Sequence, residues 1–285
     1  MEITAGSIRN VLTRTSGYLT SVTSHSLQPY RGCSLGNSLC GVGCYVQHNP
    51  YLSRGKAWGA FLEVRHNAAD SYRENFPRER RWARRHHGAF SIFLSSSTEP
   101  FPPQESRFGI TRRVLEEMLL HPPDLLVLQT HRGEVARHAD VLGKLHDRCR
   151  LRVHISIETD RERLPGLPLH GSPVQRRFEA ARRLRREGIR TVITVSPLLP
   201  IRRPEAFFRR IAECADAVVL DHFIGGDGSA QGQRTRRTAL PEAMAKTDPE
   251  SVELSYLHRM AAVAERHLPG RVGIHIDGFA GRFRR

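Results

Sequence analysis

Short apolar runs alternate with segments of helical spacing over most of the chain, and this alternation constrains the fold more than any other feature. Nearly all-apolar runs are typical of strands covered on both faces, and a parallel sheet needs a helix between successive strands. We count five such repeats before a long polar loop. The pattern predicts a parallel sheet covered by helices, in an open or partial (β/α) barrel. The strand-like runs lie at 90–96, 124–130, 151–159, 189–197, 216–223 and 271–277, and the loop at 225–238.

In such folds the chemistry gathers at the carboxyl ends of the strands. The fourth strand of the expected barrel, "VHISIET", therefore deserves a residue-by-residue interpretation. Its apolar residues are expected to meet the outer helices, and its polar residues to face the lumen, because successive side chains of a strand alternate. The first set is Val153, Ile155 and Ile157, and the second is His154, Ser156 and Glu158.

The helix expected over 172–188 has the clearest boundaries. Ser172 is placed to cap it, Pro173 suits its first turn, and Gly188 is suited to end it. Its apolar stripe consists of Val174, Phe178, Ala181 and Leu184.

The segment before Phe90 predicts a first strand near 18–24, a cysteine-containing loop and a helix around 57–67. No composition change marks a second domain. We expect one domain over residues 1–285, with a core at about 20–225 and a C-terminal extension at 226–285 that holds a helix and the last strand.

The chain is strongly basic, with a formal net charge of +15. A surface with this charge indicates nucleic acid as a partner. If the charge reflects only a compositional bias towards arginine, it indicates no partner. The densest stretch, "RERRWARRHH" at 78–87, could grip phosphates and stack a base on Trp82, or it could be a solvated helix face with one buried Trp.

No apolar run approaches the roughly 20 residues that cross a membrane, and the N-terminus lacks the apolar core of a secretory signal. An odd number of cysteines, 5 in all, fits metal binding in a reducing compartment better than a disulfide framework. We therefore expect a cytoplasmic protein that does not enter the membrane.

Three of the cysteines, Cys33, Cys40 and Cys44, lie in one glycine-containing loop. Three thiolates can bind zinc if a fourth ligand such as His48 joins them. They can instead hold three irons of a 4Fe–4S cluster and leave the fourth iron open to a ligand. Zinc modules usually present two paired ligand sets, and the chain has one, so the residues favour the cluster.

The chain resembles radical SAM enzymes, and among them the spore photoproduct lyase-like branch. The resemblance rests on an ordered series of motifs between Gln28 and His222: "QPYRGC", "SSSTEPFPPQE", "LQTHR", "HISIETD", the helix at 172–188 and "TVSPLLP". It implies a partial (β/α)6-type radical SAM barrel with an N-terminal cluster-binding loop. It also implies two cofactors, a 4Fe–4S cluster held by Cys33, Cys40 and Cys44 and S-adenosylmethionine (SAM).

Two departures from the branch are visible. Its cysteine spacing is C-x3-C-x2-C, whereas this chain has C-x6-C-x3-C, which requires a remodelled loop. Ser96 stands where spore photoproduct lyase has a hydrogen-donating cysteine. Because an O–H bond is stronger than a C–H bond, a hydroxyl is a poor hydrogen-atom donor, which argues against the thymine-dimer-splitting reaction.

The resemblance also implies which residues contact SAM. Glu99 would accept from the ammonium group, and His131 or Arg132 would meet the carboxylate. Ser156 and Glu158 would bind the ribose hydroxyls, and Ser196 would face the adenosine. Three of these residues have plain alternatives: Glu99 could cap a helix, His131 could be a surface residue of a turn, and Ser156 could bond only to backbone.

The implied function is reductive cleavage of SAM to a 5′-deoxyadenosyl radical that takes hydrogen from a substrate, either nucleic acid or a small molecule. An electron donor such as flavodoxin or ferredoxin would be a partner. The competing class is a non-catalytic zinc- or cluster-containing nucleic-acid-binding protein, which would have no SAM pocket.

Overall fold

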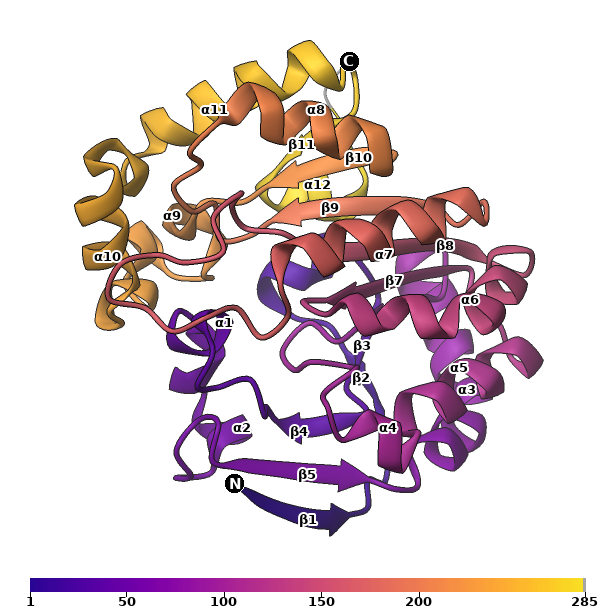
Figure 1. Ribbon diagram of the computed structural model, residues 1–285. Coiled ribbons are helices and arrows are strands. Elements are labelled where there is room, and N and C mark those ends of the chain that lie inside the picture. Colours follow the sequence, from indigo (N-terminus) through magenta and orange to yellow (C-terminus); the bar gives the residue numbers. More distant parts are fainter. Residues whose placement is uncertain (284–285) are drawn as a thin grey trace.

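The computed structural model describes residues 1–283, without the side chains of Tyr45 and Ala230. Its centre is an eight-stranded sheet in the order β11-β10-β9-β8-β7-β6-β3-β2, parallel except for β2 (Figure 1). Within the described residues no pairing joins β2 to β11, so no closed barrel is detected. The strands are β2 (Leu12–Arg14), β3 (His25–Leu27), β6 (Ser91–Leu94), β7 (Leu125–Thr130), β8 (Arg150–Ser156), β9 (Thr191–Val195), β10 (Ala217–Leu220) and β11 (Val272–Ile274).

Helices cover the outer face of this sheet, and their apolar stripes form the main core with the strands. The outer helices are α3 (Ala68–His87), α5 (Ile110–Leu120), α6 (Ala139–His146), α7 (Val174–Arg186), α8 (Pro204–Cys214) and α11 (Leu254–His267). The inner face is covered by the 3-10 helix η1 (Gly17–Ser21) and by α12 (His275–Ala280), which contact each other.

The alternation predicted for the fourth barrel strand is confirmed in β8. Val153, Ile155 and Ile157 are buried in the helix-side core. His154 lies on the opposite face, where its ring centroid is 6.0 Å from that of Phe279 in α12.

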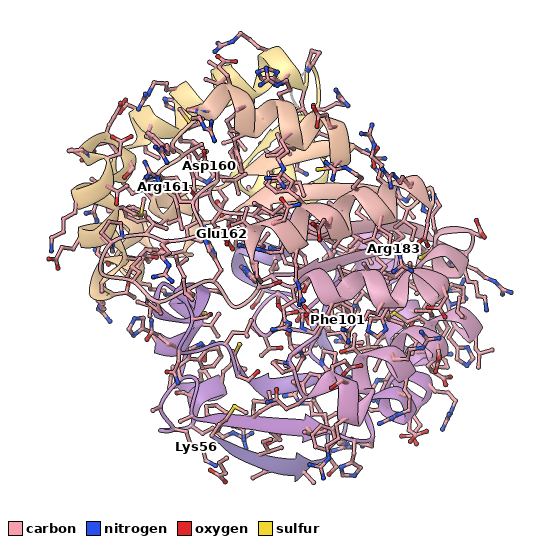
Figure 2. The ribbon with its side chains drawn as sticks, in the orientation of Figure 1. Lys56, Phe101, Asp160, Arg161, Glu162 and Arg183 are labelled. Atoms are coloured by element: carbon pink, nitrogen blue, oxygen red, sulfur yellow. The ribbon has the colours of Figure 1, made fainter. Side chains whose placement is uncertain are left out.

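Helix α7 has the expected apolar stripe but a different cap. Ser172 does not cap it: its hydroxyl accepts from the Gly133 amide at 3.3 Å. The carboxylate of Glu162, which is labelled in Figure 2, takes that role: it accepts from the Val174 and Gln175 amides at 3.1 and 3.2 Å. A carboxylate can reach two free amides and also complements the helix dipole, which a serine hydroxyl cannot.

Two N-terminal predictions are wrong. The segment 57–67 is no helix, because it contains the strand β5 (Phe61–Arg65). This strand lies between β1 (Glu2–Gly6) and β4 (Tyr30–Gly32) in a separate three-stranded sheet, and Gly59 has a φ of +87° that a helix does not allow. No strand spans 18–24, since 17–21 form η1, and the first parallel strand of the main sheet, β3, begins at His25.

The basic stretch at 78–87 is the last half of α3, a solvated helix face as one interpretation expected. Trp82 is half-buried there, with the Arg14 guanidinium 4.1 Å from its ring centroid. No helix in residues 1–283 combines the length and apolarity needed to span a membrane.

The remaining elements are short and lie mostly in connections. They are α1 (Leu39–Val42), η2 (Tyr45–His48), α2 (Pro50–Ser53), α4 (Glu105–Phe108), η3 (Gly133–His138), α9 (Phe223–Gly226), η4 (Ala230–Gly232), η5 (Thr235–Arg237), α10 (Leu240–Thr247) and η6 (Pro249–Val252).

A matched pair of leucines tests the core. Leu142 in α6 is fully buried, whereas Leu120 in α5 is 71% exposed. We expect Leu142→Ala to lower the free energy of unfolding by about 2–5 kcal/mol, because it leaves a cavity. Leu120→Ala should change it by less than about 0.5 kcal/mol. Urea denaturation measures both, and equal losses would contradict the assignment of the core.

Candidate functional site

A cavity of about 540 Å³ opens at the carboxyl ends of the parallel strands, where the fold was expected to gather its chemistry. Its walls come from segments that follow β6, β7, β8, β9 and β10, and from the cysteine loop. All three clustered cysteines and four of the five residues expected to contact SAM line it. These are Cys33, Cys40, Cys44, Glu99, His131, Glu158 and Ser196.

The cysteine loop is anchored at its start by the "QPYRGC" segment. The Gln28 amide donates to the Ser96 hydroxyl at 2.9 Å and accepts from that of Thr98 at 3.0 Å. The Arg31 guanidinium pairs with the Glu63 carboxylate of β5 at 2.6 Å. The strand β4 thus delivers Cys33 to the cavity from a segment tied to both sheets.

Glycines allow the lengthened loop to fold tightly. A Cβ on Gly36 would lie 2.2 Å from the Cα of Gly59, and one on Gly41 would lie 2.2 Å from the Gly36 oxygen. These positions therefore exclude any side chain. The inserted residues are accommodated by close backbone packing, which explains how the longer cysteine spacing still brings three thiols to one cavity.

The three thiols fit a metal centre that brings positive charge into the cavity. Among residues 1–283, no three His, Cys, Asp or Glu side chains converge closely enough to hold a single ion, and His48 is exposed and off the cavity. Burial raises the pKa of Cys33 to about 12, that of Cys44 to about 11 and that of Cys40 well above its ordinary value. A cluster spreads its irons over several ångströms and would supply the positive charge that the thiolates lack.

Glu99 is buried and does not cap a helix. Its carboxylate accepts from the Phe101 amide at 3.0 Å, the Thr130 hydroxyl at 2.5 Å and the His131 amide at 2.9 Å. It therefore joins the segments that follow β6 and β7, and it fixes the backbone of His131.

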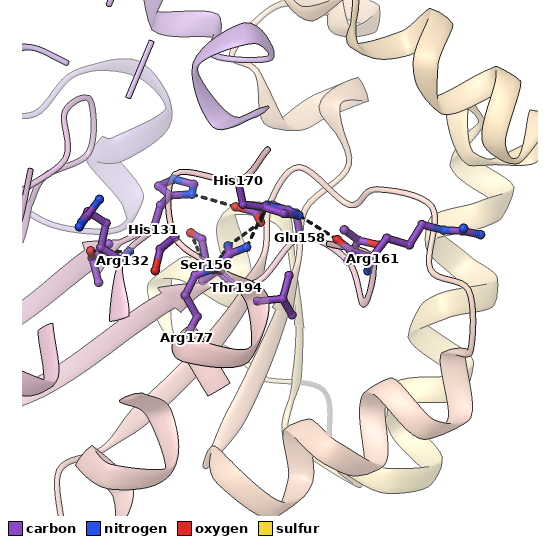
Figure 3. A network of polar contacts seen from close by, with 12 residues as sticks. His131, Arg132, Ser156, Glu158, Arg161, His170, Arg177 and Thr194 are labelled. Carbon is purple, nitrogen blue, oxygen red and sulfur yellow. Dashed lines mark hydrogen bonds and ion pairs between the residues drawn. The ribbon is translucent and has the colours of Figure 1, made fainter. Parts of the chain in front are cut away.

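Glu158 is the centre of a buried polar network (Figure 3). One of its carboxylate oxygens is 2.8 Å from Nδ1 of His131, and the other accepts from the Arg177 guanidinium at 2.7 Å. Arg177 also donates to the Ser156 backbone oxygen and lies 2.9 Å from Nδ1 of His170. Burial opposes ionisation of Glu158, but the charge of Arg177 and the His131 contact hold its pKa well below the ordinary value.

The other expected contact residues differ in their access to the cavity. Ser156 is off the cavity wall: its hydroxyl accepts from the Gln129 amide at 2.9 Å, and Gln129 lines the cavity in its place. Arg132 turns away and pairs with Glu134 at 2.9 Å. Ser196 lines the cavity and donates to the Asp221 carboxylate at 2.8 Å.

Sequence analysis missed three residues of the cavity and its polar network: Gln129, Arg177 and Asp221. The position of Asp221 could have been recognised in the sequence, because Asp221 directly follows an apolar strand and Glu158 lies two residues after one. Arg177 had none, because it is one of many arginines in α7 and only the packing makes it the buried one.

Removal of the Arg177 charge tests the network. Arg177→Met leaves the Glu158 carboxylate buried without its cation, and we expect a loss of about 3–5 kcal/mol in the free energy of unfolding at pH 7. The neighbouring Arg176, whose side chain is 65% exposed, supplies the control Arg176→Met, expected to be nearly neutral.

The pH dependence separates charge from packing. The pKa of Glu158 is lowered in the folded state, so its contribution is present above the unfolded value of about 4.3 and is lost as the pH falls below it. In Arg177→Met the carboxyl has lost its cation, so we expect burial to raise its folded-state pKa and the carboxyl to take up a proton as the pH falls from 7. The difference in free energy of unfolding between wild type and Arg177→Met should therefore narrow from pH 7 to about pH 4. A constant difference in urea denaturation would show that packing alone is lost.

No protein-family model matches the sequence, and no curated protein matches it. Solved structures do match. A spore photoproduct lyase variant with bound AdoMet and dinucleoside spore photoproduct aligns with a TM-score of 0.62 at 14% identity, over 95% of this chain and 81% of that one. Another, with dinucleoside spore photoproduct, gives 0.63 at 13% identity over the same shares. The chain therefore has the fold of spore photoproduct lyase, as its motif order predicts.

Proposed function

We propose that the protein is a radical SAM enzyme. The observation that carries the proposal is the meeting of three cysteines, one buried and two half-buried, with Glu99, His131 and Glu158 around one cavity, in a chain with the fold of spore photoproduct lyase. When bound, a reduced 4Fe–4S cluster would supply the electron that cleaves SAM and yields a 5′-deoxyadenosyl radical for hydrogen abstraction. A flavodoxin or ferredoxin would supply that electron. The solved relative with AdoMet in its title supports the choice of SAM.

Cys33, Cys40 and Cys44 would hold the cluster, and the polar residues beside them would hold SAM. His131 is fixed twice, by Glu99 through its backbone and by Glu158 through Nδ1, so Nε2 is the ring nitrogen left for a ligand. In its protonated form it would meet the SAM carboxylate. Glu99 accepts two bonds at Oε1 and one at Oε2, so one lone-pair site on Oε2 remains for the ammonium group.

Glu158 and Ser196 line the cavity with acceptor capacity to spare, and we assign them to the ribose hydroxyls and the adenosine. Ser156 would act on the ribose only through Gln129, whose amide it positions.

The substrate reaction need not be that of spore photoproduct lyase. Ser96 has a hydroxyl that accepts from Gln28, and an O–H group is a poor hydrogen-atom donor. The resemblance therefore does not identify the substrate, which is either a nucleic acid or a small molecule. All five cysteines are free, and we place the protein in the reducing cytoplasm.

Cysteine variants test the cluster. We expect anaerobically reconstituted wild type to be brown and to contain iron and sulfide. Cys33→Ala, Cys40→Ala and Cys44→Ala should each lose most of both, because each removes one of three ligands. Cys149→Ala and Cys214→Ala are matched controls that should retain them, since neither cysteine lines the cavity. Zinc without sulfide in wild type would favour the non-catalytic nucleic-acid-binding class.

Glu158 variants test the SAM contacts. Charge-assisted hydrogen bonds contribute roughly 1.5–3 kcal/mol, so Glu158→Ala should weaken SAM binding by about one to two decades, measured by calorimetry on reconstituted protein. Glu158→Gln keeps the shape and should lose less. The iron content of both should equal that of wild type. An Ala variant that binds SAM like wild type would remove Glu158 from the site.

Dithionite-reduced wild type should also form 5′-deoxyadenosine, detected by chromatography.

A further inference from the structure

A second polar group lies where three neighbouring strands end. Asp221 follows β10, Ser196 follows β9 and His275 follows β11. The Asp221 carboxylate accepts from the Ser196 hydroxyl at 2.8 Å and lies 2.7 Å from Nδ1 of His275. Asp221 and Ser196 line the cavity, whereas His275 supports them from outside its wall. The carboxylate is thus held in one orientation by residues that follow the strands on either side of β10.

The charge of Asp221 is less well compensated than that of Glu158. Asp221 is 5% exposed, and among residues 1–283 its one ion-pairing partner is His275, which is charged only when protonated. Glu158, by contrast, has the permanent charge of Arg177. Arg234, whose cationic side chain also lines the cavity, is exposed and donates to the Asp227 backbone oxygen rather than to Asp221. A buried carboxylate of this kind is stabilised by a ligand that brings a positive charge.

Aromatic rings line the same cavity. Phe279 lies one helical turn after His275 in α12, so both residues share one side of that helix. Its ring centroid is 6.3 Å from that of Phe93 and 6.5 Å from that of Tyr18, and all three line the cavity. Such rings accept a flat apolar group and also favour a nearby cation.

We propose that Asp221, held by Ser196 and His275, binds a protonated amine of the substrate, and that Phe93 and Phe279 pack against an apolar or aromatic group attached to it. This proposal gives the substrate class of the enzyme proposed above. The binding of an amine does not depend on that function, but the statement that the amine belongs to a substrate does. It runs against the net charge of +15, which by itself would attract anions. A preference for cations therefore has to come from this local site.

The first experiment needs no variant. Saturation-transfer NMR compares 2-phenylethylamine with phenylacetate, which share a ring and differ in the sign of their charge, on reconstituted protein with and without SAM. We expect the amine to bind at least about tenfold more tightly than the acid, as one charge-assisted hydrogen bond would give. Equal binding, or tighter binding of the acid, would overturn the proposal. The measurement without SAM separates this outcome from failure of the radical SAM assignment.

The second experiment assigns the amine site to Asp221. Asp221→Asn keeps the shape and should weaken amine binding about tenfold, with SAM affinity within about twofold of wild type. Glu253→Gln removes a negative charge from an exposed position and is the matched control, expected to bind the amine like wild type. If Asp221→Asn weakened the binding of SAM as much as that of the amine, Asp221 would belong to the cofactor site and the proposal would be wrong. If that variant does not fold, the wild-type comparison still decides the cation preference.

Discussion

The ion pair between Glu158 and Arg177 joins the outer helix α7 to the cavity. Both side chains are almost fully buried, at 2% and 1% exposure, and their nearest charged atoms are 2.7 Å apart. Two charges removed from water are tolerated only when their geometry is good and their remaining hydrogen-bonding capacity is used. Here His131, His170 and the Ser156 backbone use much of that capacity, although the Nε of Arg177 has no partner among the described residues. The position of α7 against β8 and the orientation of His131 therefore depend on the same contact.

The cysteine loop depends on a different constraint, the absence of side chains. Gly36, Gly41 and Gly59 meet at distances that only bare backbone permits, and Arg31 and Gln28 secure the start of the loop to both sheets. A long loop would otherwise lose much conformational entropy on ordering. Close packing and two polar anchors offset that cost, so three thiols separated by unusual spacings can still face one cavity.

Charge is distributed unequally between the surface and the cavity. The surface carries most of the 44 basic residues, whereas the acidic side chains of the cavity, Glu99, Glu158, Asp221 and Asp227, are all buried. Each of them is held by neighbouring donors, and Glu158 alone has an arginine partner among the described residues. The net charge of the chain thus says little about the ligand of the cavity, since buried groups act through local contacts that salt screens weakly.

The sequence by itself determined the layers of the fold and the end of the sheet at which the cavity opens. Strand and helix periodicity are local properties, so β6 to β10, α7 and the two faces of β8 were predictable, and motif order gave the cysteines, Glu99 and Glu158. The tertiary structure decided the rest. "FLEVR" became a strand because β1 and β4 pair with it, and Ser156 lost its access to the cavity because Gln129 lies over it. Arg177 and Asp221 acquired their roles from partners 19 and 54 residues away, and such long-range pairing leaves no periodic signal in the sequence.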